Sequence, residues 1–329
     1  MIGKRAQGLF KPCLVDPDPQ DQSGDDSAAD KVGRNDKPGV WSKIHEHYSA
    51  GCAVADAAAG RAAEAVRDGR ASSLLSAGNT GAAMAASMLR MGRIKGVARP
   101  AIAVPFPVVG STPSTLLDCG ANADCQPEWL VQFARLGTAY ARERFGLENP
   151  RVATLTIGEE AGKGNTLVKE ACALLEQSEW AEECGARYIG NVEGGDLMAG
   201  VADVIVCDGF TGNIALKTAE GTASLVSGLL RDAFNATILS KVSALLALSS
   251  LRRLSKRVDP RRNNGGVFLG LNGTVVKSHG AADAMGFSAA VKLAFQLAQS
   301  GFSDKLAARV ASAATLQQDA ATTSDNKSG

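Results

Sequence analysis

The sequence predicts an α/β fold: a mixed, mostly parallel sheet that helices cover on both faces. Three observations lead to this prediction. Strand-like apolar runs alternate with helix-like segments, an order typical of parallel strands joined by helices. Gly and Asn follow several of the strand-like runs, where the chain has to turn. A length of 329 residues and a hydrophobic share of 45% are enough for a substantial core.

The two ends of the chain differ from its centre in composition. Residues 16–38 are acidic, contain Ser, Gly and Pro, and have few apolar side chains. We therefore expect residues 1–40 to be disordered or irregular. Residues 41–310 are expected to form the α/β domain, and residues 311–329, which end in TTSDNKSG, a flexible tail.

Five segments of the expected domain each combine a strand-like run with a helix-like one. In chain order they are residues 71–91, 115–145, 151–177, 186–221 and 265–299. In the second segment, Pro127 is well placed for the first turn of its helix. The fourth segment is expected to contain two strand ends, at Ile189 and Cys207.

Gly followed by Asn recurs directly after strand-like runs. The pairs are Gly78-Asn79, Gly164-Asn165, Gly190-Asn191 and Gly212-Asn213, with a near version at Gly120-Ala121-Asn122. In open α/β sheets ligands gather outside the carboxyl ends of the strands, and free N–H groups at helix starts attract anions. The turns therefore predict a phosphate site, above all VCDGFTGNIALKTAEG at residues 206–221. Each could equally be an ordinary connection, because Gly permits tight turns and Asn caps helices.

Patterns for other chemistries are missing. GEEAGKGN, residues 158–165, has one residue too few between its glycines for a Walker loop, and Gly164 replaces the Ser or Thr that would hold Mg²⁺. No GxGxxG follows a strand, and no GxSxG elbow occurs. Seven cysteines without a CxxC pair indicate neither zinc nor disulfides. A net charge of +1 argues against nucleic-acid binding, and neither a metal nor a redox cofactor is expected.

Four cations lie beside the turns: Lys163, Lys217, Lys277 and His279. Lysine is a good point-charge partner for phosphate, and His279 could be a general acid or a phosphate ligand. Each of the four could also be an ordinary surface or loop residue. Carboxylates near the strand ends could cap helices or pair with these same lysines. They are Asp118, Asp203, Asp208 and Glu220.

Residues 238–262, ILSKVSALLALSSLRRLSKRVDPRR, form a second distinctive stretch. Apolar residues recur there at helical spacing among seven Lys or Arg side chains. Such a segment can lie in a membrane interface with its cations on anionic headgroups, or it can pack against a second subunit. The positions expected to contact a membrane are Val242, Leu245, Leu246, Leu251 and Leu254.

Several of these stretches together resemble the PlsX family, the acyl-carrier-protein-dependent phosphate acyltransferases of bacterial phospholipid synthesis. The similarity runs from about Ala71 to Gly301, and the stretches follow the family's order. They are SAGNTGAAMAA, LLDCGANADCQPEWLVQFARLG, IGEEAGKGNTLVKEA, YIGNVEGGDLM, VCDGFTGNIALKTAEG and GLNGTVVKSHGAAD. SAGNTGA and VCDGFTGNIALKTAEG are specific signatures.

The resemblance implies a fold similar to phosphotransacetylases and isocitrate-dehydrogenase-like enzymes, in a homodimer. It implies that a long-chain acyl-carrier-protein thioester and inorganic phosphate give acyl phosphate and free carrier protein. The acyl phosphate would pass to a membrane glycerol-phosphate acyltransferase for phospholipid synthesis. The enzyme would be cytoplasmic and peripherally attached to the membrane, with residues 238–262 as a protruding amphipathic hairpin.

The site residues follow from this chemistry as a hypothesis. Because phosphate itself attacks the thioester, the enzyme has to hold phosphate and stabilise the oxyanion, without a covalent nucleophile. Lys217, Lys277 and His279 are expected to be catalytic, the lysines by balancing charge and His279 as a donor or proton carrier. A larger set is expected to bind phosphate and substrate: Ser76, Gly78, Asn79, Thr80, Asn122, Lys163, Asn165, Asp208, Gly212 and Asn213.

The N-terminal region departs from the family pattern. Family members begin with a strand that ends in a glycine-rich DAMGGD-type motif, followed by a further βα unit, and the first 40 residues show neither. Two alternatives therefore stay open. One is a coenzyme-A-dependent short-chain phosphotransacetylase, against which the basic amphipathic stretch argues. The other is an inactive truncated relative that binds acyl-carrier protein or membrane.

Overall fold

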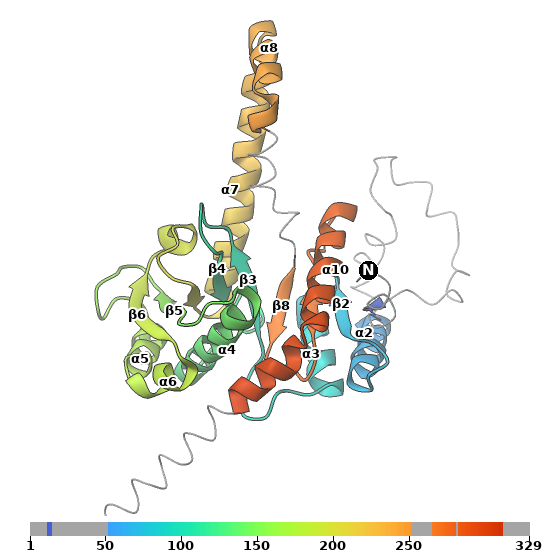
Figure 1. Cartoon of the computed structure of the whole chain (residues 1–329), viewed down its shortest axis with the longest axis vertical. Coiled ribbons are helices and arrows are strands. Elements are labelled where there is room, and N and C mark those ends of the chain that lie inside the picture. Colours follow the sequence, from blue (N-terminus) through green and yellow to red (C-terminus); the bar gives the residue numbers. More distant parts are fainter. Residues whose placement is uncertain (1–11, 15–51, 252–264, 281, 312–329) are drawn as a thin grey trace, which may run out of the picture.

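The computed structural model describes residues 12–14, 52–251, 265–280 and 282–311, and every structural statement below concerns these residues. They contain a nine-stranded sheet in the order β1-β2-β9-β8-β3-β4-β7-β5-β6 (Figure 1). The strands are β1 (Pro12–Leu14), β2 (Ser73–Ser76), β3 (Ala101–Phe106), β4 (Ser114–Leu117), β5 (Arg151–Leu155), β6 (Arg187–Val192), β7 (Val204–Val206), β8 (Gly266–Leu269) and β9 (Val275–Lys277). Five neighbouring pairs are parallel and three are antiparallel, which confirms the predicted mixed, mostly parallel sheet.

Helices cover both faces of this sheet (Figure 1). They are α2 (Cys52–Arg67), α3 (Thr80–Arg90), α4 (Pro127–Phe145), α5 (Thr166–Leu175), α6 (Ser178–Cys184), α7 (Gly209–Asn235), α8 (Ile238–Leu246) and α10 (Ala284–Gln299), with the short 3-10 helix η4 (Gly194–Met198). Pro127 occupies the first turn of α4, as the sequence predicts.

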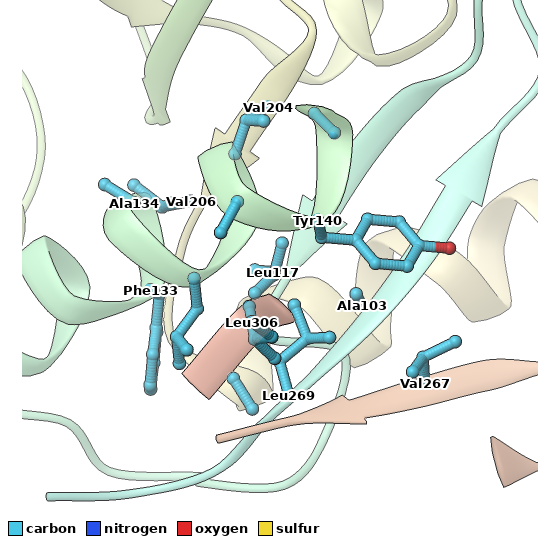
Figure 2. Close-up of a cluster of buried hydrophobic side chains, with 14 of the residues drawn as sticks. Ala103, Leu117, Phe133, Ala134, Tyr140, Val204, Val206, Val267, Leu269 and Leu306 are labelled. Carbon is cyan, nitrogen blue, oxygen red and sulfur yellow. The ribbon is translucent and has the colours of Figure 1, made fainter. Parts of the chain in front are cut away.

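The hydrophobic core is divided between the two faces because consecutive strand residues point in opposite directions. On one face, Val204 and Val206 of β7 lie in a cluster with Phe133 and Tyr140 of α4 (Figure 2). On the other face, Ile205 belongs to a second cluster, which includes residues of α2 and η4. A sheet buried on both faces explains why its strands are continuous apolar runs in the sequence.

One predicted strand end is wrong. The expected end at Ile189 lies inside β6, which continues to Val192 and therefore contains the pair Gly190-Asn191. The reason is a bulge: Val152 and Thr154 of β5 pair with β6 residues that are three positions apart, so that β6 carries one extra residue. Gly190 has a φ of 89°, a conformation that glycine adopts readily. The glycine therefore belongs to a β-bulge and not to a turn.

The helix α7 is 27 residues long, about 40 Å, and extends from the body of the molecule with α8 at its far end (Figure 1). Among its residues, Gly209 and Gly212 alone are buried. The large apolar side chains of α8 are exposed: Ile238, Leu239, Val242, Leu245 and Leu246. Residues 252–262 of the predicted hairpin, Leu254 among them, lie outside the described residues. Within the described ranges, no helix is long and apolar enough to span a bilayer.

The predictions for residues 1–40 and 311–329 fall almost wholly outside the described residues. Within the first segment, Pro12–Leu14 is an exception to the expected irregular chain, because it forms β1 and pairs in parallel with β2. Proline is tolerated at the start of an edge strand, because its lack of an N–H costs no hydrogen bond to a neighbouring strand there. Of the second segment, Ala311 is described, at the end of a helical stretch.

Candidate active site

A cleft of ≈ 1820 Å³ lies beside the carboxyl ends of β2 and β9 and the beginnings of α3 and α7. β2 and β9 are parallel neighbours, with Ser76 opposite Lys277, so the segments that follow them leave the sheet at the same edge. Seven of the predicted site residues line this cleft: Gly78, Asn79, Thr80, Asn213, Lys217, Lys277 and His279.

Lys217 and His279 are 62 positions apart in the chain, yet their side chains meet in the cleft. The Lys217 ammonium lies 3.0 Å from Nε2 of His279 and 2.7 Å from Oε2 of Glu220. The same carboxylate oxygen is 3.8 Å from Nε2 of His279. Because an ammonium can only donate, Nε2 accepts, which assigns a neutral imidazole with its proton on Nδ1. We refer to Lys217, Glu220 and His279 as the Lys-Glu-His cluster.

Burial and nearby positive charge lower the pKa of Lys277 and of His279 in the cleft. Burial, and then the charge of Lys217, lower the pKa of Lys277 to about 8. Burial and Lys217 also lower the pKa of His279, while Glu220 acts in the opposite direction. An anion bound beside Lys277 and His279 would stabilise their charged forms. The cleft is therefore electrostatically suited to a multiply charged anion such as phosphate.

The beginning of α3 contributes to the same end of the cleft. Asn79 is the N-cap of α3, and its Oδ1 accepts a 3.0 Å hydrogen bond from N of Ala82. The first N–H groups of a helix have no partner within it, and the positive end of the helix dipole lies there. Asn79 thus does cap a helix, and it does so in the wall of a cleft that also holds cations.

The stretch 206–221 does not form the glycine-rich turn that the sequence predicts. α7 begins at Gly209, directly after Asp208, whose carboxylate caps the helix. The glycines lie in the first turn of α7, close to the loop that begins at Asp118. A Cβ atom at Gly212 would lie 1.9 Å from the carbonyl oxygen of Asp118. Gly209 and Gly212 therefore allow close packing of the helix start.

Asp118 is buried and organises the loop on which α7 rests. Its carboxylate accepts hydrogen bonds from the backbone N–H groups of Ile102, Ala121 and Asn122, and from the Asn122 side-chain amide. Burial raises the pKa of this carboxyl group, and these hydrogen bonds oppose the shift. The Asn122 carbonyl accepts a 2.7 Å bond from N of Gly209, so the loop also holds the first residue of α7.

Six residues of the predicted binding set do not line the cleft. They are Ser76, Asn122, Lys163, Asn165, Asp208 and Gly212. Asn165 caps α5 through a 2.9 Å bond from N of Val168. Lys163 is exposed and lies 3.9 Å from Glu160. The turn at Gly164-Asn165 is therefore a helix cap away from the cleft, one of the two roles left open for it.

The strand-end carboxylates also have structural roles. Asp208 caps α7, and Asp203 forms a 2.8 Å ion pair with Arg151. Glu220 pairs with Lys217, the kind of contact that the sequence left as an alternative.

The opposite wall of the cleft was missed in the sequence analysis. It consists of the end of β3 and the loop that follows it, from Val104 to Ser111, together with Leu197 and Met198 of η4. The available signal was the apolar run VPFPVVG at residues 104–110, in a part of the chain to which no element was assigned. With this wall, the cleft has a cationic end and an apolar end.

Among the residues that the structure describes, no group of three or more His, Cys, Asp or Glu side chains is placed to hold a metal ion.

Comparisons with known proteins agree with one another. Residues 42–305 match the family described as fatty acid synthesis protein. A phosphate acyltransferase from Ruegeria sp. (strain TM1040) is 56% identical over 265 residues, which are 80% of this chain and 70% of that protein. One from Paracoccus denitrificans (strain Pd 1222) is 56% identical over 249 residues, 75% of this chain and 67% of that protein. A solved phosphotransacetylase from Streptococcus pyogenes covers 80% of this chain and 76% of its own, at a TM-score of 0.50 and 16% identity, a likeness in fold alone.

Proposed function

Because the chain belongs to the PlsX family of fatty acid synthesis proteins, which includes the phosphate acyltransferases, we propose that it transfers a long-chain acyl group from acyl-carrier protein to inorganic phosphate. The observation that carries this proposal is the cleft in which Lys277 and the Lys-Glu-His cluster lie beside the start of α3. The products are acyl phosphate and free acyl-carrier protein, and the acyl phosphate supplies phospholipid synthesis.

The proposed reaction is a direct displacement. One oxygen of hydrogen phosphate forms a bond to the thioester carbonyl carbon, and the carbon–sulfur bond then breaks. The proton of the hydrogen phosphate ends on the departing carrier-protein sulfur, so no outside proton donor is needed. The protein has to hold two reactants in register and stabilise the negative charge that develops on the carbonyl oxygen.

Each group in the cleft has a proposed task in this displacement. The Lys277 ammonium and the first N–H groups of α3 hold phosphate, because both present positive charge at the same end of the cleft. Lys217 donates to the developing oxyanion, and the Nδ1–H of His279, which points away from Lys217, donates to the phosphate. Glu220 positions Lys217 through their 2.7 Å contact. Asn213 and Thr80, which also line the cleft, orient the reactants.

The choice of acyl donor tests the proposal. The full chain is incubated with phosphate and either palmitoyl acyl-carrier protein, palmitoyl-CoA or acetyl-CoA, and acyl phosphate is trapped as the hydroxamate. We expect product mainly from the carrier-protein thioester. Faster turnover of acetyl-CoA would favour the short-chain phosphotransacetylase. No product from any donor, with carrier protein still bound, would identify an inactive relative.

The proposal extends to where the protein works. We propose a cytoplasmic homodimer whose α8 lies on the membrane surface, which would bring acyl phosphate close to a membrane glycerol-phosphate acyltransferase. The exposed apolar side chains of α8 support this placement: Leu245 is 70% exposed and Leu246 is 83% exposed. An apolar helix face with neighbouring cations is the kind of surface that binds an interface with anionic lipids.

A further inference from the structure

The active-site cleft continues past its cations into an apolar section that the proposed chemistry does not use. One wall of this section is the face of α7 from Ala219 to Val226, and the other is the loop between β3 and β4 with η4. On α7, the lining residues beyond Glu220 carry no charge, and neither do those of the loop. A section with apolar walls that opens from a cationic site suits a substrate that has both an anionic and an apolar part.

On the α7 wall of this section, the side chains are small near the cations and larger farther out. Ala219 and Ala223 are one helical turn apart, and Val226 follows almost one turn later. All three line the cleft. From Lys217 to Val226 the helix rises by about 14 Å. The small alanine side chains leave room along a line that starts at the Lys-Glu-His cluster and runs outward along α7.

The opposite wall is held in place by packing. Phe106 and Leu197 are almost fully buried, with exposed fractions of 3% and 4%. Val108 lies against the turn after η4, because a Cβ atom at Gly200 would be 2.8 Å from its Cγ1. Met198 is 45% exposed at the edge of the cleft. On this side the section is therefore lined by the packed residues Phe106, Val108 and Leu197, and on the other side by α7.

We propose that this apolar section holds the acyl chain of the substrate, and that the small side chain of Ala223 lets the chain continue along α7 to Val226. The inference rests on the proposed function, because the thioester carbonyl has to reach the Lys-Glu-His cluster. An acyl chain that extends from that carbonyl along α7 meets Ala219, Ala223 and Val226, in a wall that also contains the hydroxyl groups of Thr222 and Ser224. Each methylene that leaves water strengthens binding roughly fourfold, which gives the chain a reason to follow this wall.

The test is a tryptophan scan along α7 with chain length as the readout. The variants are Ala223→Trp and Val226→Trp, with Leu225→Trp as the matched control, since Leu225 is exposed on the same helix but does not line the cleft. Acyl phosphate formation is measured with carrier-protein thioesters of increasing chain length. Binding of a fluorescent long-chain fatty acid, cis-parinaric acid, is measured in parallel, and oligomeric state is checked by size-exclusion chromatography with light scattering.

We expect Ala223→Trp to keep activity with short chains and to lose roughly fourfold in kcat/KM for each methylene it excludes. Val226→Trp should affect only the longest chains, and Leu225→Trp should match the wild type. Retained short-chain activity shows that a variant is folded. Identical chain-length profiles in all four proteins would overturn the inference. A changed oligomeric state of Ala223→Trp with an unchanged profile would also overturn it and identify this wall as a subunit interface.

The same data separate this inference from the proposed function. If the wild type makes no acyl phosphate from any thioester, the proposed reaction is wrong. If it nevertheless binds the fluorescent fatty acid and Ala223→Trp does not, the acyl site stands without that reaction. If the wild type turns over long chains and Ala223→Trp does so equally well, the reaction stands and the acyl site is wrong.

Discussion

Lys277 lies in the cleft with a pKa well below that of an ordinary lysine. Burial and the charge of Lys217 lower its pKa to about 8. Lys277 is therefore positively charged below about pH 8 and loses its charge as the pH rises through that value. We expect kcat/KM for phosphate to fall above about pH 8. The variant Lys277→Arg should move this fall to higher pH, because a guanidinium stays charged. Lys163→Arg, at an exposed site outside the cleft, is the control and should leave the profile unchanged.

His279 offers a second check on the same electrostatics. Burial is the first cause of its lowered pKa and Lys217 the second, while Glu220 acts to raise it. Lys217→Ala should therefore raise the pKa of His279, and Glu220→Gln should lower it. An NMR titration of the imidazole signals can follow both changes, since the chain has only three histidines. A His279 pKa that is equal in the wild type and in Lys217→Ala would show that the two side chains do not meet.

For individual residues, the sequence predicted which side chains belong to the cleft better than it predicted their contacts. Lys217, Lys277 and His279 were predicted from cations next to turns, and all three line the cleft. The 3.0 Å contact between Lys217 and His279 could not be predicted, because it depends on how two distant segments cross. Ser76 and Lys163 fit the same local pattern as the cleft residues, yet they lie outside it.

At the start of α7, glycine allows the helix to pack closely against the neighbouring loop. We expect Gly212→Ala to destabilise the protein by about 2–4 kcal/mol, because its Cβ would lie 1.9 Å from the carbonyl oxygen of Asp118. Gly221→Ala, in the same helix with nothing within 4 Å of the added Cβ, is the matched control. It should stabilise the protein by up to about 1 kcal/mol. Urea unfolding of both variants measures the difference, and equal midpoints would contradict the packing role.

The apolar surface of α8 leads to a prediction about membranes. Leu246→Asp should weaken binding to vesicles with anionic lipids, because it places a carboxylate among exposed apolar residues that would enter the interface. Leu89→Asp is a close control, since Leu89 and Leu246 are both 83% exposed and Leu89 lies on α3. Vesicle co-sedimentation compares the two. An equal loss in both variants, or no loss in either, would argue against α8 as the contact surface.

Element ends were predictable where local chemistry decides them. Pro127 in the first turn of α4 and Asn165 as the cap of α5 are local signals, and both appear in the structure. The pair Gly190-Asn191 was misread because a β-bulge and a turn use the same residues. Which of the two forms depends on the partner strand, and no local pattern contains that information.

For the whole molecule, alternating strands and helices were enough to predict the fold class but not the order of the strands. The antiparallel strands β3 and β8 lie at the centre of the sheet, and β3 is in a part of the chain to which no element was assigned. Their pairing brings residues 101–103 opposite 267–269, a contact between distant segments. The same arrangement places the β3–β4 loop across from α7, which is why the apolar wall of the cleft was missed.

The central claim is that phosphate attacks an acyl thioester between Lys277 and the Lys-Glu-His cluster. The most direct measurement is kcat/KM for phosphate, with palmitoyl acyl-carrier protein as donor, in the wild type, Lys217→Ala, His279→Ala and Lys163→Ala. Loss of one preorganised donor to an oxyanion lowers turnover by about 10²–10³. We predict losses of about that size in Lys217→Ala and His279→Ala, and wild-type values in Lys163→Ala. Unchanged values in both Lys217→Ala and His279→Ala would contradict the account.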